Sequence, residues 1–263
     1  MPVRSPAPRR RLRGGFDVTF RSLQVRNFRV YTTGQLVSVT GTWMQIVGQA
    51  WLVLELTGSG AMLGLVTALQ WVPTLVLGPL AGVLADRSDK RRIMLCTQAA
   101  AMAQALLLGV VVATGAVQLW MVMVLALTLG LVAAVEGPAR QTFIFEMVGG
   151  ERVTNAVSLN TLTANLGRLV GPAIAGLLIA GWGVATCFFV NVVSYLFTLG
   201  ALLMVRRRDL HAPPPVRRAR GQLREGLRLT WASPGLRVPL LLMVVMGTFT
   251  YEHQVLLPLM AWP

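Results

Sequence analysis

Residues 93–135 read IMLCTQAAAMAQALLLGVVVATGAVQLWMVMVLALTLGLVAAV, a run of 43 positions without a charged residue. One membrane crossing by an α-helix needs about 20 apolar residues. The run is therefore long enough for two crossings, and Thr114-Gly115 near its middle is a typical turn signal. A backbone in lipid must satisfy its hydrogen bonds within the segment, so both crossings are predicted to be helices.

Three other runs extend this pattern. Residues 30–54 and 56–85 contain no charge, and residues 153–205 contain one, Arg168. The last run is long enough for two crossings and has a turn signal at residues 181–183. The sequence thus predicts an all-α membrane protein with six spans and part of a seventh, which begins near Val238. The six spans are placed at residues 30–54, 62–84, 93–113, 118–138, 156–180 and 184–205.

The composition excludes most other classes of protein. Hydrophobic residues make up 54% and charged residues 13%, against about 25% charged in soluble proteins. Both cysteines lie in apolar runs, and there are only two histidines. We find no phosphate loop, no zinc-protease motif and no cluster of metal ligands, so we expect no enzyme, no cofactor and no bound metal.

Basic residues alternate along the chain in step with these spans. Of the 24, eight precede the first span, four lie between spans 2 and 3, two flank the 4–5 connection and nine lie between spans 6 and 7. Connections rich in arginine stay in the cytoplasm. This predicts a multi-pass protein of the bacterial inner membrane with a cytoplasmic N-terminus, whose basic segments attract anionic lipid and not nucleic acid. Its regions are a basic arm (1–29), a six-helix half-bundle (30–205), a basic linker with an amphipathic helix (206–237) and an incomplete seventh helix (238–263).

Polar residues inside the predicted spans are candidates for function. Arg168 lies in the middle of the fifth span, where it either lines a substrate or coupling cavity or clamps two helices together. The i, i+4 pair Glu136 and Arg140 lies at the cytoplasmic end of the fourth span, and an ion pair near the headgroups is the favoured interpretation. Uncharged side chains add further candidates, which either line a polar cavity or bond neighbouring helices: Gln45, Gln49 and Asn165.

Small residues and prolines repeat between two of the spans. Gly78-Pro79 in the second span is matched by Gly171-Pro172 in the fifth, with a further glycine a few residues later in each. These two spans run in opposite directions, so spans 1–3 and 4–6 form a candidate inverted repeat, as in secondary transporters. Glycines also allow helices to pack closely, and we assign that role to Gly167, Gly171, Pro172 and Gly176.

The connection between spans 2 and 3 reads GVLADRSDKRRIM over residues 82–94. It resembles the signature loop of the major facilitator superfamily, G-x-L-A-D-R-x-G-R-[KR]-x-x-[LI], with Asp89 in place of the usual glycine. Residues 167–176 are similar to the antiporter motif, and residues 136–141 resemble a Pro-Ala-Arg-Gln element of the branch with siderophore and macrolide exporters.

The resemblance implies a transporter in which two six-helix halves rock about a central site. It also implies that Gly82, Asp86, Arg87 and Arg91 form a latch that holds the cytoplasmic side closed. We expect export of a hydrophobic drug or secreted metabolite, driven by protons. A complete member needs a second half that these 263 residues do not contain. The chain is thus expected either to be a fragment of such a transporter or to be a truncated, inactive remnant of one.

Overall fold

The computed structural model describes residues 20–211 and the isolated residues 233, 235, 237, 238 and 242. Most of the predicted basic arm, linker and seventh helix lies outside this part of the chain. Of Pro79, Asp86 and Arg87 only the backbone is described. All regular elements in the described residues are helical. Six long helices form the bundle: α2 (Arg26–Thr57), α3 (Gly60–Arg87), α4 (Lys90–Ala113), α5 (Leu119–Val148), α6 (Val153–Trp182) and α7 (Val184–Met204).

Four of the five breaks between the six helices contain a glycine with positive φ, whereas Ser88 and Asp89 separate α3 from α4. Gly58 (φ 60°) follows α2, Gly149 (φ 70°) follows α5, Gly183 (φ 83°) follows α6, and Gly115 (φ 71°) lies in the turn after α4. This backbone region costs glycine little and other residues much more. Five of the six helices are long and apolar enough to cross a membrane. α2 falls outside that set, and its buried side carries several amides and hydroxyls.

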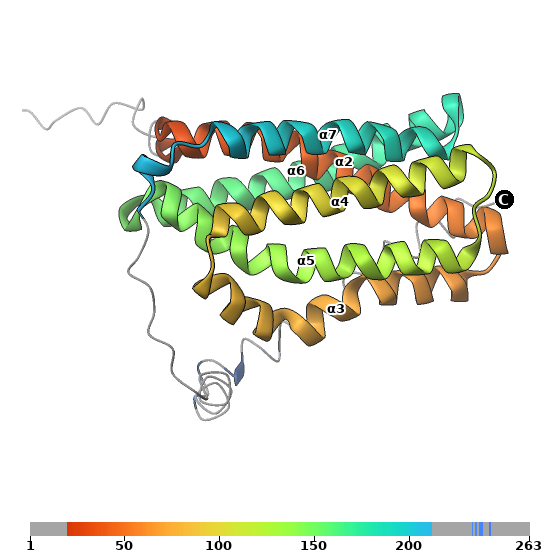
Figure 1. The fold of residues 1–263 in the computed structure, drawn as a ribbon, viewed down its shortest axis with the longest axis horizontal. Coiled ribbons are helices and arrows are strands. Elements are labelled where there is room, and N and C mark those ends of the chain that lie inside the picture. Colours follow the sequence, from red (N-terminus) through yellow and green to blue (C-terminus); the bar gives the residue numbers. More distant parts are fainter. Residues whose placement is uncertain (1–19, 212–232, 234, 236, 239–241, 243–263) are drawn as a thin grey trace, which may run out of the picture.

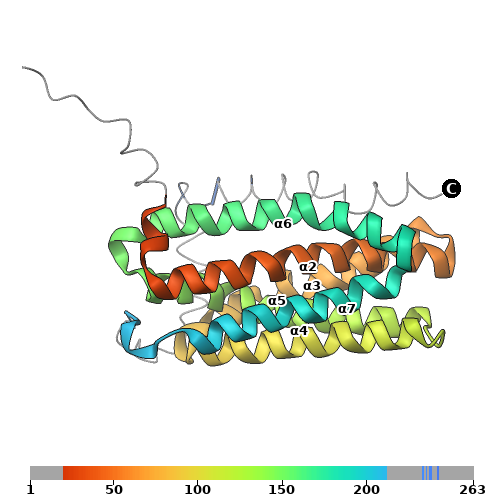
Figure 2. The same ribbon diagram turned by 90° about the horizontal axis from the view of Figure 1, so that it is seen from above.

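The six helices run side by side, with α2 between α6 and α7 (Figures 1 and 2). α3 lies at the edge and packs mainly on α5, while α4 packs on α7 and α5. These contacts form matched pairs: α2 with α6 corresponds to α5 with α3, and α2 with α7 corresponds to α5 with α4. Exchanging α2, α3 and α4 for α5, α6 and α7 therefore preserves the main contacts, as an inverted repeat requires.

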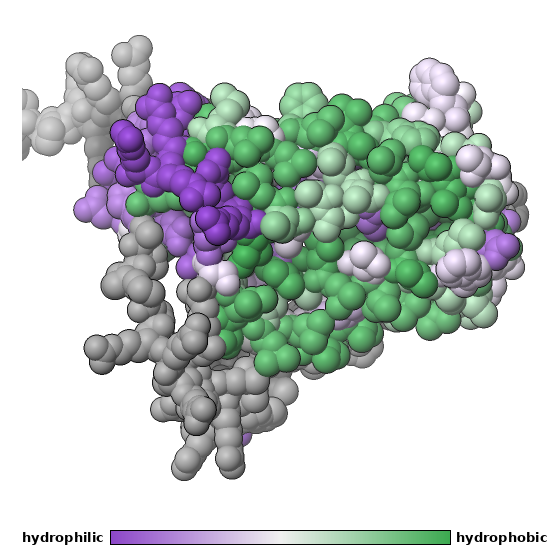
Figure 3. Space-filling view, viewed as in Figure 1, coloured by the Kyte–Doolittle hydropathy of each residue, from purple (hydrophilic) through white to green (hydrophobic). Residues whose placement is uncertain are grey.

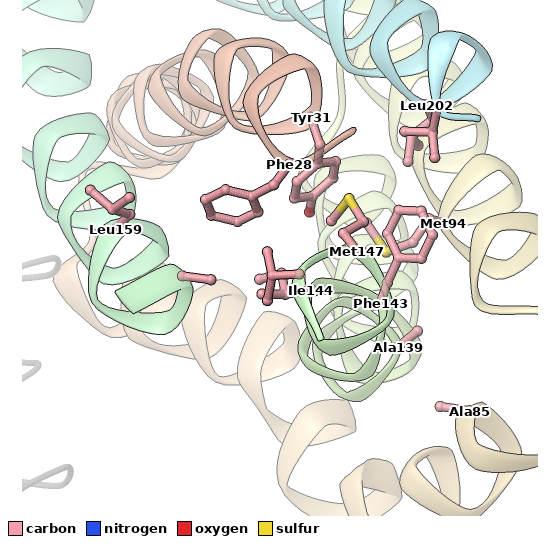
Figure 4. Close-up of a cluster of buried hydrophobic side chains, with 13 residues drawn as sticks. Phe28, Tyr31, Ala85, Met94, Ala139, Phe143, Ile144, Met147, Leu159 and Leu202 are labelled. Atoms are coloured by element: carbon pink, nitrogen blue, oxygen red, sulfur yellow. The ribbon is translucent and has the colours of Figure 1, made fainter. Parts of the chain in front are cut away.

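One end of the bundle is strongly polar, and most of the rest of its visible face is apolar (Figure 3). Hydrophilic residues gather where α2 begins and α7 ends (Figure 3). Beneath this end lies a buried hydrophobic cluster, which we call the basic-end cluster (Figure 4). Its larger members are Phe28, Tyr31, Met94, Phe143, Ile144, Met147, Leu159 and Leu202. The cluster contains residues of all six helices and closes this end of the bundle.

Candidate functional site within the helix bundle

The signature loop joins α3 to α4 at the basic end. Asp89 caps α4, because its Oδ1 accepts a hydrogen bond from the Arg92 backbone N–H at 3.1 Å. A carboxylate is favoured there by the free N–H groups and by the helix dipole. The residue that departs from the family's glycine therefore starts the next helix. Gly82 has open space around its Cα among the described residues, and the side chains of Asp86 and Arg87 lie outside them.

Arg91 bonds to the end of α7 within the same bundle. Its Nε donates to the Leu202 carbonyl at 2.8 Å and its Nη2 to the Leu203 carbonyl at 2.9 Å. The last carbonyls of a helix have no partner inside the helix, so a guanidinium there satisfies two of them at once. Arg91, which the resemblance groups with the latch, thus ties α4 to α7.

Two ion pairs extend this connection. Lys90 Nζ lies 3.5 Å from Glu146 Oε1, and Arg207 Nη1 lies 3.6 Å from Asp89 Oδ2. They join the start of α4 to the end of α5 and to the short 3-10 helix η3 (Arg207–Asp209), which follows α7. The end of the signature loop that begins α4 is therefore bonded to α5, α7 and η3 of the same half-bundle.

Glu136 and Arg140 lie inside α5 and not at its end. The sequence placed them near the headgroups because the fourth span was expected to stop at residue 138. α5 instead continues past Pro138 to Val148, and its last two turns are buried in the basic-end cluster. The Glu136 side chain is 7% exposed. Its Oε1 accepts hydrogen bonds from Arg140 Nη2 and, at 2.8 Å, from Gln98 Nε2 of α4.

Two tyrosines complete this charged centre. Tyr31 of α2 and Tyr195 of α7 interact electrostatically with both Glu136 and Arg140. The Tyr31 ring stands edge-on to Phe143, with 5.9 Å between centroids. Three buried polar atoms of this centre have no hydrogen-bond partner among the described residues: Tyr31 Oη, Gln98 Oε1 and Arg140 Nε. Leaving a buried polar atom without a partner is costly. These three atoms remain able to bond a further group, such as a proton donor or a water molecule.

Gln45 belongs to a second network, in which every side-chain nitrogen and oxygen has a hydrogen-bond partner. Its Nε2 donates to Gln104 Oε1 at 2.8 Å, and its Oε1 accepts from Asn191 Nδ2 at 2.6 Å. Asn191 Oδ1 accepts in turn from the Ser194 hydroxyl, and Gln104 Nε2 donates to the Leu125 carbonyl. All four side chains are buried. This network bonds α2, α4, α5 and α7 to each other.

Gln49 lies one turn further along α2, beside a small cavity. Its Nε2 donates to Gln70 Oε1 at 3.3 Å, while its Oε1 has no partner among the described residues. The two glutamines and Thr67 form the polar part of the cavity, whose volume is about 10 Å³. That volume suits a single water molecule.

Arg168 stacks on an aromatic ring at the contact between α6 and α2. Its guanidinium carbon lies 4.8 Å from the centroid of Trp43. Such cation–π contacts hold an arginine in place within apolar surroundings. Asn165, nearly one turn earlier on α6, is exposed in this structure.

The glycines of α6 differ in what surrounds them. A Cβ added to Gly167 would meet Val39 and Thr40 of α2. A Cβ added to Gly171 would meet Thr40, Trp43 and Met44 of the same helix. Pro172 lies within the helix, and Gly176 has no atom in the way. Glycines spaced by seven on α2 play the same part against α7: Gly34, Gly41 and Gly48.

Several residues of these networks were not predicted from the sequence. Gln98, Gln104 and Asn191 are uncharged polar residues in apolar runs, which is a signal that the sequence did contain. Tyr31 gave no such signal, because it lies at the start of a predicted span, where tyrosine is expected at the membrane interface. Among the described residues, no group of three or more histidine, cysteine or acidic side chains is placed to hold a metal ion.

Comparison with known proteins places the chain in a family. The family model described as "Transmembrane secretion effector" matches residues 18–262. The chain is 30% identical over 160 residues to the staphyloferrin A transporter of Staphylococcus aureus, covering 60% of this chain and 40% of that protein. It is 30% identical over 235 residues to the multidrug efflux pump Tap of Mycolicibacterium fortuitum, covering 85% and 57%.

A third relative is the macrolide efflux protein A of Streptococcus pyogenes, which is 26% identical over 179 residues, or 68% of this chain and 44% of that protein. The chain spans about half the length of the curated relatives it matches.

Proposed function

The chain belongs to the major facilitator superfamily, in its transmembrane secretion effector family, and from this membership we propose that it acts in the export of a small molecule. Export is driven by protons and proceeds by alternating access. The cargo is a hydrophobic drug or a secreted metabolite, and the compounds named for its relatives include staphyloferrin A and macrolides. The protein spans the bacterial inner membrane with its N-terminus in the cytoplasm.

The observation that carries this proposal is the buried centre of Glu136, Arg140 and Gln98. A carboxylate inside a membrane bundle is costly to bury, and residues of this kind usually have a function. Here it shares one oxygen between a guanidinium and an amide. Protonation of Glu136 releases Arg140 from the ion pair and changes how α4 contacts α5. Such a change links proton uptake to movement of the helices.

Other candidate residues take supporting roles. Arg168 on Trp43, together with Asn165 and Gln49, supplies contacts for the cargo, and a second half-bundle completes the cavity. Asp86 and Arg87 latch the cytoplasmic side against that half. Gln45 acts in packing, because its amide is saturated within the bundle.

The test uses protein expressed from its full reading frame and reconstituted in lipid vesicles. Radiolabelled erythromycin serves as a macrolide probe and staphyloferrin A as a siderophore probe. We expect an imposed pH gradient to drive uptake of at least one probe into vesicles with the inside-out orientation. E136Q removes the titrating group with little change of shape, so gradient-driven uptake should fall at least tenfold.

Q45M is the matched control, since it alters a buried glutamine outside the charged centre. Its effect should be on stability and not on the dependence on pH. Uptake that persists unchanged after the gradient has been collapsed, or that is as fast in E136Q as in the unmodified protein, contradicts proton coupling at Glu136. Failure of both probes to move contradicts the proposed cargo class.

A further inference from the structure

We propose that Gln98 is a positioning residue that serves Glu136 in both of its protonation states and so sets the pH at which this carboxyl takes up a proton. The inference rests on the proposed function, because it concerns the same proton site. The two polar atoms of the Gln98 amide differ in their hydrogen bonding. Gln98 Nε2 donates to Glu136 Oε1 at 2.8 Å, whereas Gln98 Oε1 is buried and has no partner among the described residues.

When Glu136 is ionised, only the nitrogen of the Gln98 amide has a hydrogen-bond partner. A carboxylate only accepts hydrogen bonds, and so it takes the N–H of Gln98 and leaves the amide oxygen without a donor. The Gln98 side chain is 2% exposed, so bulk water does not supply one. Gln98 Oε1 is thus an acceptor beside the Glu136 carboxylate, which has no proton to donate to it.

In the protonated state the same amide has the matching partner. A proton binds a carboxylate oxygen of Glu136, the ion pair with Arg140 is lost, and the carboxyl O–H becomes a donor. Rotation about the last torsion of Gln98, which is broad and roughly two-fold, brings Oε1 to accept it. No covalent bond other than the O–H forms, and the transferred proton is the only change of charge.

The other groups that face Glu136 do not offer this exchange. Arg140 of α5 only donates, and the Tyr195 hydroxyl of α7 lies 3.4 Å from Thr42 Oγ1. The Tyr31 hydroxyl of α2 has no hydrogen-bond partner among the described residues, so it does not bond the Glu136 carboxyl. α4 contributes the uncharged Gln98, which alone bonds the carboxyl from another helix in the described residues.

The experiment follows the protonation of Glu136 directly. Protein expressed from its full reading frame is reconstituted in lipid vesicles, and infrared difference spectra are recorded across pH without any transported compound. The C=O band of protonated Glu136 is the one that E136Q removes. In Q98M the side chain keeps its length but loses the amide. The charge-assisted bond to the carboxylate is the stronger of the two that Gln98 makes, so its loss disfavours the ionised form.

We therefore expect the midpoint pH of the Glu136 band to rise in Q98M by about one, a tenfold change in proton affinity. The C=O frequency should also rise, because the protonated carboxyl loses its acceptor. Q104M is the matched control: Gln104 is on the same helix and is equally buried, but it bonds Gln45 and not Glu136. Its midpoint and frequency should match those of the unmodified protein.

An unchanged midpoint and frequency in Q98M overturns the inference, as does an equal change in Q104M, which would indicate loosened packing. If Q98M does not insert, Q98A is measured in its place with the same expectations. A shifted band without gradient-driven uptake leaves the inference intact and contradicts the proposed function. If uptake depends on Glu136 but the Glu136 band does not shift in Q98M, the proposed function is supported and the inference about Gln98 is contradicted.

Discussion

At the scale of a residue, one methyl group separates glycine from alanine, and Gly171 has no room for it. A Cβ there would lie 2.6 Å from the Trp43 Cβ, 2.7 Å from the Thr40 carbonyl oxygen and 3.0 Å from the Met44 backbone nitrogen. Two of these atoms are backbone, so the contact is relieved only by moving α6 away from α2. Overpacking of this kind costs about 1–3 kcal/mol. We expect G171A to lower the free energy of unfolding by that amount, measured by denaturation in detergent.

Gly176 of the same helix provides the control, because no atom lies within 4 Å of its added Cβ. G176A should leave stability unchanged or raise it by up to about 1 kcal/mol, since alanine favours the helix. Equal losses in both variants would mean that helix geometry, and not the close approach of α2, makes glycine necessary at residue 171.

The signature loop separates into residues with different tasks. Arg91 bonds the α7 carbonyls of its own half-bundle, whereas Asp86 is assigned to the latch by family resemblance. R91Q should therefore lower the unfolding temperature, with a loss of about 1 kcal/mol for a partly exposed charged hydrogen bond. D86N should insert and unfold as the unmodified protein does but impair uptake in the vesicle assay.

The neighbouring Arg92 serves as the reference for R91Q. Its side chain is 75% exposed and its ion pair with Asp89 spans 3.5 Å, so R92Q should be nearly neutral. A D86N protein that transports normally would contradict the latch, and an R91Q protein as stable as R92Q would show that the bonds to α7 contribute little.

The charged residues of the candidate site could be predicted from the sequence, whereas the uncharged residues that contact them could not. Glu136 and Arg140 are noticeable because charges are rare in apolar runs, and their spacing of four predicts a pair on one helix face. Their partner Gln98 was not predicted. A glutamine on a neighbouring span has no fixed spacing to Glu136, since only tertiary packing brings α4 and α5 together at that height. The same reason hides Tyr31 and Asn191.

At the scale of an element, helix breaks were more predictable than helix ends. The turns expected near Gly115 and Gly183 are present, because glycine is the residue that adopts positive φ at little cost. The end of the fourth span was placed at residue 138, ten residues before α5 stops at Val148. Apolar length marks where a helix enters lipid. It does not mark where the helix ends when Phe143, Ile144 and Met147 bury the following turns in a protein core.

The repeat within the bundle was predicted from two short sequence matches and is expressed far more clearly in the contacts. α3 and α6 occupy equivalent positions, each packed on the first helix of the other triplet. Gly78-Pro79 and Gly171-Pro172 lie on these two helices. Sequence similarity between the triplets is slight because lipid-facing positions accept any apolar residue. The packing between helices is what the fold preserves.

At the scale of the whole molecule, the distribution of charge predicts its orientation. The basic starts of α2 and α4 and the basic end of α7 lie at one end of the bundle (Figure 3). The opposite end carries the turn at residues 114–118, which contains no basic residue. By the positive-inside rule, the basic end is expected to face the cytoplasm. This predicts that the turn after α4 faces outward and that the turn after α5 faces inward.

Single cysteines in these two turns test that orientation. The background protein has Cys96 and Cys187 replaced by alanine, since Cys96 is exposed. In intact cells a membrane-impermeant maleimide should label A116C, in the outer turn. G150C, in the basic turn after α5, should be labelled only after the membrane has been permeabilised. Labelling of G150C in intact cells would reverse the orientation. Glu136 lies nearer to the basic end of α5, so its protons would then exchange with the outside and the proposed direction of coupling would reverse with it.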